Sequence, residues 1–166
     1  STCRQKSVII VTDGADTYTC GGNGSSTYAK QRRAPVVYAK ALKDAGYDVY
    51  VVGFGDSLDE NDKRTLNWMA YYGGTRNPDD TQSVVTTGLT LPAATDACSS
   101  SGSDPKDTDI SGYAFMASDP AALAAALKSA LSSIQEANYS FSSQASVAAA
   151  RVQDENFLYE ASFEPK

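Results

Sequence analysis

The sequence predicts an α/β domain built on a parallel sheet, and three observations lead to that prediction. Short β-branched runs alternate with helical patterns over most of the 166 residues. The first two runs are closed by Asp13-Gly14 and Gly55-Asp56, which are strong turn signals. The runs are apolar on both faces, as is typical of strands in a parallel sheet with right-handed crossovers.

Three segments are predicted to be strands. Residues 7–12 (SVIIVT) and 48–54 (DVYVVGF) are apolar and rich in β-branched side chains. Residues 112–116 (GYAFM) form a shorter third run. Together they give a sheet that is covered by the helices between them.

Three helices are expected to follow these strands. Residues 28–45 show an apolar helical period only in their second half, so this helix is expected to start at Pro35, with proline in its first turn. Ser57 or Asp59 caps the second helix, which Gly73-Gly74 stop. Pro120 opens the third, whose leucines and alanines recur at helical spacing.

Two stretches depart from this alternation. Residues 75–111 are rich in Thr, Ser, Asp and Gly and are too long for an ordinary connection, so they form an insertion, with a small hairpin expected around 83–91. After residue 136 the pattern becomes extended and alternating. We therefore divide the chain into a domain at 1–136 and, at 137–166, a linker with β segments that lead towards a further domain.

Charge and composition exclude several function classes. The chain has 14 basic and 20 acidic residues and a net charge of −6, which disfavours nucleic-acid binding and docking on anionic membranes. It has no His, so a catalytic triad or zinc site that uses imidazole is excluded. No apolar run approaches the roughly 18 residues of a membrane span.

Ligands of parallel sheets bind beyond the carboxyl ends of the strands. Asp13 follows the first strand directly, so it is either a metal ligand or the cap of the following turn. A second candidate is the loop of Asp107, Asp109 and Ser111, which matches the opening of an EF-hand loop. Ser118 stands where that loop needs a bidentate Glu, so a solvated acidic loop is the favoured interpretation.

The three cysteines, Cys3, Cys20 and Cys98, contain no CxxC pair. Cys3 precedes its strand and lies at the end of the sheet opposite Asp13, and Cys98 lies in a helix-to-strand connection that returns to that end. Topology therefore favours a Cys3–Cys98 disulfide over Cys3–Cys20. Three unpaired thiols are the alternative.

Four segments carry a resemblance to a known family. They are VIIVTDG at 8–14, VYVVGFG at 49–55, Gly73-Gly74-Thr75, and YAFMASD at 113–119 with its long helix. Together they resemble the second half of a von Willebrand factor A domain, over roughly 3–136. The resemblance implies a partial, three-layer, Rossmann-like sheet of the von Willebrand A type with helices on both faces.

A narrower resemblance adds the cysteine before the first strand and the segment SVAAARVQDENFLYEASFEP at 146–165. These features are similar to PilY-type proteins of type IV pili, in which a short β passage joins the A domain to a β-propeller. The resemblance implies a non-enzymatic binding or scaffold module of a secreted protein that acts in pilus biogenesis and surface adhesion. It also implies export through the periplasm to the pilus tip or the cell surface and outer membrane, with partners in the pilus or on a host or abiotic surface.

The family binds Mg²⁺ or a similar cation through a DxSxS motif, a Thr and the Asp of the TDG run. Of these the chain contains Asp13 alone, so the resemblance implies an incomplete site for Mg²⁺ or Ca²⁺, to which Asp16 and Thr17 are weak candidate additions. The strand that pairs with residues 7–12 in the family is also missing. We therefore expect a homodimer that joins two Ser7–Thr12 strands or exchanges C-terminal strands.

Two other function classes are compatible with parts of the sequence. A haloacid dehalogenase-like phosphatase needs Asp-x-Asp after the first strand, and Asp13-Gly14-Ala15 fails that pattern. A nucleophilic Asp also needs an acid/base partner, so we predict that the chain is not an enzyme. An intracellular von Willebrand A domain that binds a protein partner is disfavoured by the Ser/Thr-rich insertion and the propeller-like tail.

Overall fold

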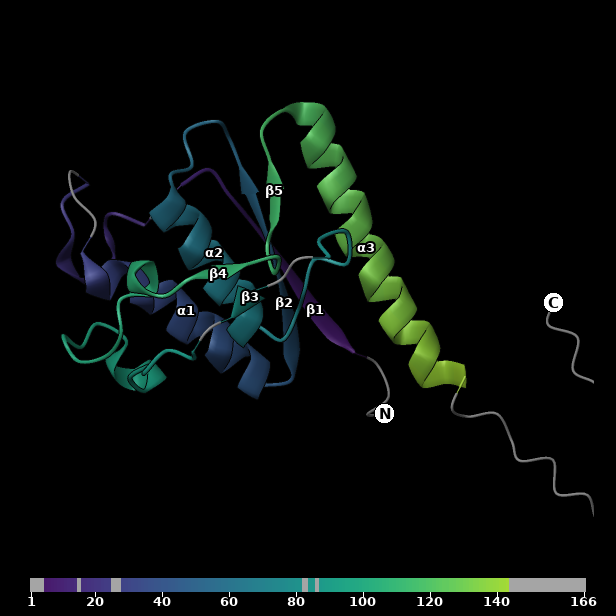
Figure 1. The fold of residues 1–166 in the computed structure, drawn as a ribbon. Helices are drawn as coiled ribbons and strands as arrows, with labels where there is room; N and C mark the ends of the chain where they lie inside the picture. Colours follow the sequence, from purple (N-terminus) through teal and green to yellow (C-terminus); the bar gives the residue numbers. More distant parts are fainter. Residues whose placement is uncertain (1–4, 15, 25–27, 82–83, 86, 144–166) are drawn as a thin grey trace, which may run out of the picture.

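A parallel sheet of three strands forms the centre of the chain (Figure 1). The structure is a computed structural model, and it describes residues 5–14, 16–24, 28–81, 84–85 and 87–143. The strands are β1 (Lys6–Thr12), β2 (Tyr47–Phe54) and β5 (Phe115–Ala117), in the spatial order β1-β2-β5. Both strand pairs are parallel, which confirms the predicted α/β class and is consistent with a Rossmann-like fold.

Three α-helices accompany this sheet: α1 (Ala29–Asp44), α2 (Glu60–Tyr72) and α3 (Pro120–Ser143). Of the two predicted caps of α2, Ser57 and Asp59, the structure shows Asp59. Its carboxylate accepts the Asp62 N–H at 2.8 Å. Asp119 accepts two backbone N–H groups in the first turn of α3. Both carboxylates satisfy amide donors that a helix start leaves unpaired.

Helix α1 corrects the expectation that this helix starts at Pro35. It begins at Ala29, and Pro35 lies inside it. Gln31 fixes the first turn: its side-chain oxygen accepts the Tyr28 N–H at 2.6 Å and its side-chain amide donates to the Thr17 carbonyl at 2.8 Å. The first half of α1 therefore buries polar side chains, and an apolar period cannot reveal it.

The side chains of β2 pack in two separate clusters. Val49 and Val51 lie in one cluster, which α1 and α2 complete with residues that include Val36, Leu66 and Trp68. Tyr50 and Val52 lie in the other, which Phe115 and the apolar side of α3 complete. All of Asp48–Gly53 is buried, as expected for the central strand.

The insertion contains short elements only. These are η2 (Ala94–Asp96), η3 (Pro105–Asp107), β3 (Val84–Val85) and β4 (Ile110–Ser111), while η1 (Thr19–Gly21) lies in the earlier polar loop.

The hairpin expected around 83–91 is wrong, because Val84–Val85 pairs antiparallel with Ile110–Ser111 at the far end of the insertion. The chain after β3 bonds instead to α2, where the Tyr72 hydroxyl donates to the Leu89 carbonyl at 3.1 Å and accepts the Leu89 N–H at 2.8 Å.

Helix α3 runs further than expected, since it continues to Ser143, past the change of character that the sequence suggested after residue 136. The C-terminal β extension, with its alternating residues 157–163, lies outside the described residues. Within the described part of the chain, no helix combines the length and the apolar character needed to cross a bilayer.

Candidate functional site

The carboxyl ends of the three strands line two cavities. Thr12, Asp13 and Gly14 contribute to a cavity of about 210 Å³ that α1 and α2 complete, with Pro35 and Asp62 among its lining residues. We call it the acidic cavity.

The ends of β2 and β5 line a second cavity of about 350 Å³, through Gly55, Asp56, Ala117 and Ser118. The strand ends that the sequence singled out therefore surround open space at one edge of the sheet.

Three carboxylates line the acidic cavity, from Asp13, Asp16 and Asp62. Burial raises the pKa of Asp62, and the negative charge of Asp59 adds to that effect. Burial also acts to raise the pKa of Asp16, but hydrogen bonds from Thr19 and from the Tyr18 N–H outweigh it, so this pKa is lowered. The pKa of Asp62 is therefore raised and that of Asp16 is lowered, although both carboxylates line the same cavity.

Several oxygen atoms in and beside the acidic cavity already accept hydrogen bonds. One Asp16 oxygen accepts the N–H groups of Tyr18 and Thr19, each at 2.9 Å. The Thr17 carbonyl accepts hydrogen bonds from Gln31 and from the Gly24 N–H. Across the described residues, no three His, Cys, Asp or Glu side chains are grouped so that they could hold a metal ion. Asp13 alone cannot supply the roughly six oxygens that Ca²⁺ or Mg²⁺ takes.

The second candidate loop is held by ion pairs. Asp107 lies in η3 and pairs with Lys106 at 2.6 Å, while Asp109 pairs with Arg64 at 2.7 Å. Ser111 lies in β4, opposite Val84. Both carboxylates are largely exposed, and each faces a different basic side chain.

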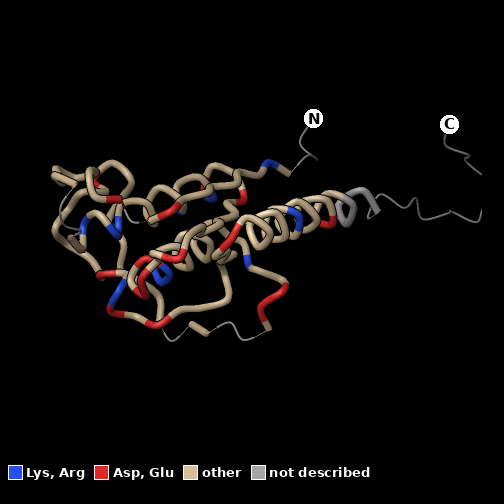
Figure 2. The backbone as a smooth tube through the Cα atoms, turned by 90° about the horizontal axis from the view of Figure 1, so that it is seen from above, with Lys and Arg blue, Asp and Glu red and all other residues tan. Residues whose placement is uncertain are grey.

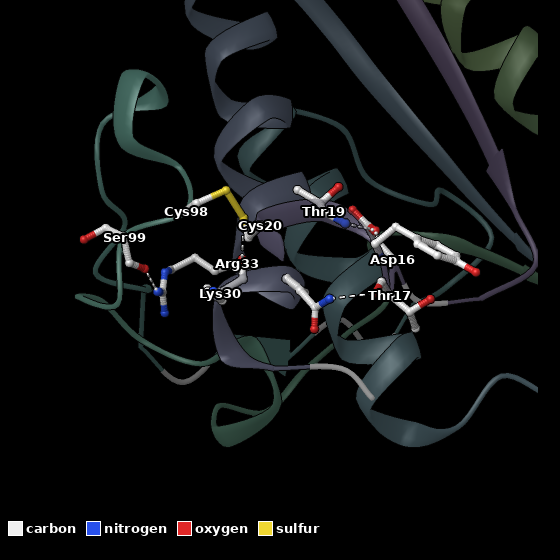
Figure 3. The surroundings of a disulfide bond; sticks show 10 residues. Asp16, Thr17, Thr19, Cys20, Lys30, Arg33, Cys98 and Ser99 are labelled. Carbon is white, nitrogen blue, oxygen red and sulfur yellow. Dashed lines mark hydrogen bonds between the residues drawn. A yellow bond between two sulfur atoms is a disulfide. The ribbon is translucent and has the colours of Figure 1, made fainter. Parts of the chain in front are cut away.

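The disulfide joins Cys20 to Cys98 (Figure 3), with 5.1 Å between the Cα atoms. The predicted Cys3–Cys98 pairing is therefore wrong, because Cys98 is bonded to Cys20. Cys3 itself lies outside the described residues. The reason is the length of the insertion, which crosses α1 and brings Cys98 to the loop that follows β1 instead of returning to the opposite end of the sheet.

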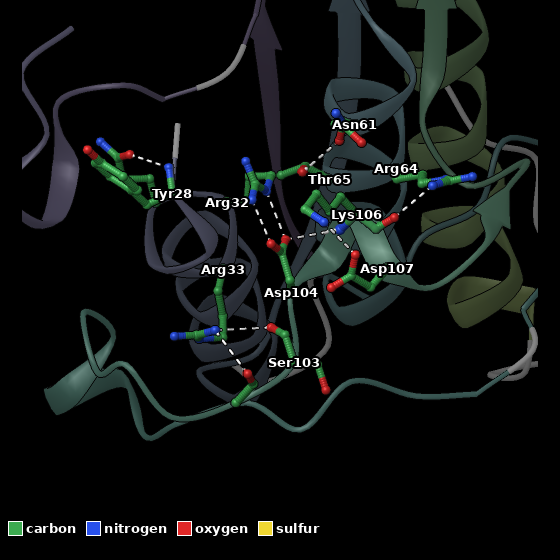
Figure 4. Close-up of polar contacts among 12 residues, drawn as sticks. Tyr28, Arg32, Arg33, Asn61, Arg64, Thr65, Ser103, Asp104, Lys106 and Asp107 are labelled. Carbon is green, nitrogen blue, oxygen red and sulfur yellow. Dashed lines mark hydrogen bonds and ion pairs between the residues drawn. The ribbon is translucent and has the colours of Figure 1, made fainter. Parts of the chain in front are cut away.

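Two arginines of α1 hold the same part of the insertion (Figure 4). Arg33 is 1% exposed and donates to the carbonyls of Gly102 at 3.2 Å, Ser103 at 3.1 Å and Ser99. Arg32 binds Asp104 through two hydrogen bonds, of 2.8 and 2.6 Å. We call the disulfide and these two arginine contacts the α1 clamp.

The ion pair of the α1 clamp shifts the pKa of both partners. The hydrogen bond to Asp104 raises the pKa of Arg32. Burial acts to raise the pKa of Asp104, but the hydrogen bonds from Arg32 and from the Lys106 N–H outweigh it and lower the pKa. The sequence did not indicate the α1 clamp. Arginine is almost never buried unless it is paired, and nothing in the run QRRAP distinguishes a buried arginine from an exposed one.

Comparisons of the chain with protein-family models, curated proteins and solved structures give no match. The inference of function therefore depends on the residues and geometry of the chain itself.

Proposed function

We propose that this chain is a binding or scaffold module of a secreted, PilY-type protein of type IV pili, with the three-layer sheet of a von Willebrand factor A domain. The observation that carries the proposal is the α1 clamp, which fixes a long Ser/Thr-rich insertion to a helix of the α/β core. Loops on a rigid scaffold are the usual carriers of recognition. The proposed role is pilus biogenesis and attachment to a surface, through the insertion.

The disulfide supports the proposed location. Disulfides persist in oxidising compartments, which include the bacterial periplasm and the cell surface. Cys20 and Cys98 belong to two loops that meet only in the folded chain. This pairing suits a protein that is exported and acts outside the cell, at the pilus tip or the outer membrane.

The proposed role does not include catalysis. The phosphatase alternative requires an acid two positions after Asp13, where this chain has Ala15. Hydrolysis of a generic phosphate ester is the inexpensive test. Turnover that disappears in Asp13→Asn would overturn the binding-module proposal in favour of an enzyme.

Genetic complementation tests the binding role. In the bacterium that carries the gene, we expect deletion of the whole gene to remove surface pili and adhesion. A gene in which the exposed residues 93–96 of the insertion are replaced by a short Gly/Ser linker keeps Cys98, the buried Leu89 and the arginine contacts of the α1 clamp. We expect it to restore pili but not adhesion.

A matched control separates loss of the insertion from loss of folding. Leu131→Ser changes an exposed side chain of α3, far from the insertion in sequence, and should restore both pili and adhesion. Full adhesion by the variant with the shortened insertion would show that this segment of the insertion is not part of the binding surface. Normal piliation and adhesion after deletion of the gene would contradict the pilus role altogether.

A further inference from the structure

The disulfide between Cys20 and Cys98 joins two loops, and α1 also holds each of them by other contacts (Figure 3). One is the loop at 16–24 that contains η1, which we call the η1 loop, and the other is the insertion. The buried side chain of Gln31 donates to the Thr17 carbonyl of the η1 loop at 2.8 Å. The two arginines of the α1 clamp hold the insertion. Both cysteines therefore stay close to α1 when the bond between them opens.

Cys20 has an unusual backbone conformation. Its φ of 59° and ψ of 32° lie in the left-handed region, and in the described parts of the chain it is the one residue other than glycine with a positive φ. The Cβ atom of an L-residue disfavours this region, so such a conformation persists only where the surrounding structure imposes it. Residues of this kind cluster at ligand clamps and switch regions. Opening the disulfide removes one of the constraints that hold Cys20 in this conformation.

The two bonded cysteines differ in exposure. Cys98 is exposed, whereas Cys20 is half-buried and packs with Ala34, Val37 and Ala97. Access is one of the factors that decide which sulfur of a disulfide an incoming thiolate attacks. Cys98 is therefore the expected point of attack, and Cys20 is the leaving group.

We propose that the Cys20–Cys98 disulfide is a reversible thiol-exchange site whose substrate is a dithiol. One thiolate of the dithiol attacks the sulfur of Cys98, which forms a mixed disulfide and releases Cys20 as a thiolate. The second thiolate of the dithiol then attacks the dithiol sulfur of the mixed disulfide, so that the cyclic oxidised dithiol leaves and Cys98 becomes a thiolate. The dithiol supplies both electrons, and the two cysteine thiolates take up the two protons that it loses.

This exchange separates the η1 loop from the insertion. Asp16 accepts the N–H groups of Tyr18 and Thr19 at the start of η1, directly before Cys20. Once its sulfur is free, Cys20 leaves the left-handed region, so that η1 unwinds and these two hydrogen bonds weaken. The arginines of the α1 clamp keep the insertion in place. The reduced protein thus has the same fold with a loosened η1 loop.

Thiol trapping tests whether the exchange takes place in the folded protein. In a Cys3→Ser background, we expect dithiothreitol to yield two free thiols, trapped with iodoacetamide and counted by mass, while the circular dichroism spectrum stays native. Removal of the dithiol in air should restore the disulfide. Exchange through global unfolding is slower than exchange in about 8 M urea by about 1,000-fold or more, because the unfolded fraction is about 10⁻³ or less. Slowing of that size, or reduction only with loss of the native spectrum, would overturn the proposal.

A monothiol identifies the sulfur that is attacked. Brief treatment of the Cys3→Ser protein with glutathione, followed by acid quenching and peptide mapping, should place the mixed disulfide on Cys98 and leave Cys20 as the free thiol. A mixed disulfide mainly on Cys20 would reverse the order of attack and contradict the proposal.

Backbone relaxation measured by NMR locates the change. On reduction, the order parameters of Tyr18 and Thr19 should fall from about 0.85 to below about 0.6, while that of the buried Thr75 stays high. Cys20→Ser/Cys98→Ser should reproduce this pattern without reductant. Unchanged order parameters of Tyr18 and Thr19 in the reduced protein would overturn the proposed loosening.

A control variant lies on α3. Figure 1 and Figure 2 show this helix extending away from the end of the molecule where the η1 loop and the insertion lie. Leu131→Ser, at an exposed side chain of α3, should leave the exchange rate and the order parameters of the η1 loop unchanged. An effect of Leu131→Ser as large as that of reduction would show that the loosening is not specific to the disulfide, and it would equally overturn the proposal.

Discussion

Arg33 is the residue on which the position of the insertion depends most. Its guanidinium is buried and donates to three backbone carbonyls, those of Ser99, Gly102 and Ser103. Arg33→Met fills similar space but leaves these carbonyls without a donor. We expect the free energy of unfolding to fall by about 2–4 kcal/mol, since each buried polar group that loses its partner is costly. Urea denaturation measures this change.

Two further variants define the role of Arg33. Arg33→Lys keeps the charge but cannot reproduce the planar fork, so we expect it to recover only part of the loss. Arg76→Met removes an exposed arginine that makes a long hydrogen bond, of 3.4 Å, to the Asp80 carbonyl, and it should change stability little. Equal effects of Arg33→Met and Arg76→Met would show that Arg33 does not hold the insertion.

Asp104 makes part of the stability depend on pH. Its pKa lies below the ordinary value because the hydrogen bonds from Arg32 and from the Lys106 N–H outweigh the effect of burial. A carboxyl with a lowered folded-state pKa stabilises the fold above its unfolded pKa of about 3.9, and this stability is lost as pH falls through the folded-state value. Asp104→Asn should therefore cost about 1.5–3 kcal/mol at pH 7.

The measurement is urea denaturation of wild type and Asp104→Asn from pH 7 to pH 2.5. We expect the difference between the two proteins to be constant above about pH 5 and to shrink as the pH falls below about 4. Taking this difference cancels the contributions of titrating groups that the substitution does not affect. A difference that does not change with pH would mean that the ion pair does not contribute to acid sensitivity.

At the scale of elements, sequence patterns predicted what depends on local chemistry. The three parallel strands, the Asp59 cap and the start of α3 follow from β-branched runs and capping residues, and the structure confirms them. The start of α1 and the partner of β3 could not be predicted, because they depend on contacts between distant parts of the chain. Gln31 bonds to Thr17, and Val84 pairs with Ser111, across separations that no local period encodes.

The candidate site shows the same limit. The sequence predicted that Asp13 would lie at the carboxyl edge, because the end of a buried strand fixes that position. It did not predict the Cys20–Cys98 pairing, since the path of a long insertion sets it. Nor did it indicate that Asp109 would pair with Arg64.

The disulfide should contribute strongly to the stability of the insertion and of α1. It closes a loop across a sequence separation of 78 residues. A chain-entropy treatment of a loop this long gives about 4 kcal/mol of stabilisation. Cys20→Ser/Cys98→Ser should therefore lower Tm by about 10 °C, on the scale of 2–4 °C per kcal/mol for a chain of this size.

Scanning calorimetry with and without reductant checks this expectation. Reduction of the wild type should reproduce the Tm of the double serine variant. Cys3→Ser is the control for the third cysteine and should leave Tm unchanged under oxidising conditions. A double variant as stable as the wild type would show that Arg32 and Arg33 suffice to hold the insertion.

At the scale of the whole molecule, a cation titration tests whether the chain contains a complete binding site for Mg²⁺ or Ca²⁺ or only part of one. Asp13 is the one ligand that the family resemblance assigns here, and the acidic cavity adds no complete ligand set among the described residues. We therefore expect about 10 mM Mg²⁺ or Ca²⁺ to shift Tm by less than about 1 °C. A site with a Kd of about 1 mM would instead add about 1.4 kcal/mol at that concentration and raise Tm by about 3–6 °C.

Asp13→Ala decides the meaning of either result. If the wild type shows the small expected shift, Asp13→Ala should show the same one, because neither protein has enough oxygen ligands. A larger shift that disappears in Asp13→Ala would mean that residues outside the described part of the chain complete the site, and the proposed function would then include cation-dependent binding at the carboxyl edge. A larger shift that survives Asp13→Ala would place the cation elsewhere. The paired acidic side chains Asp107 and Asp109 would then be the first to replace.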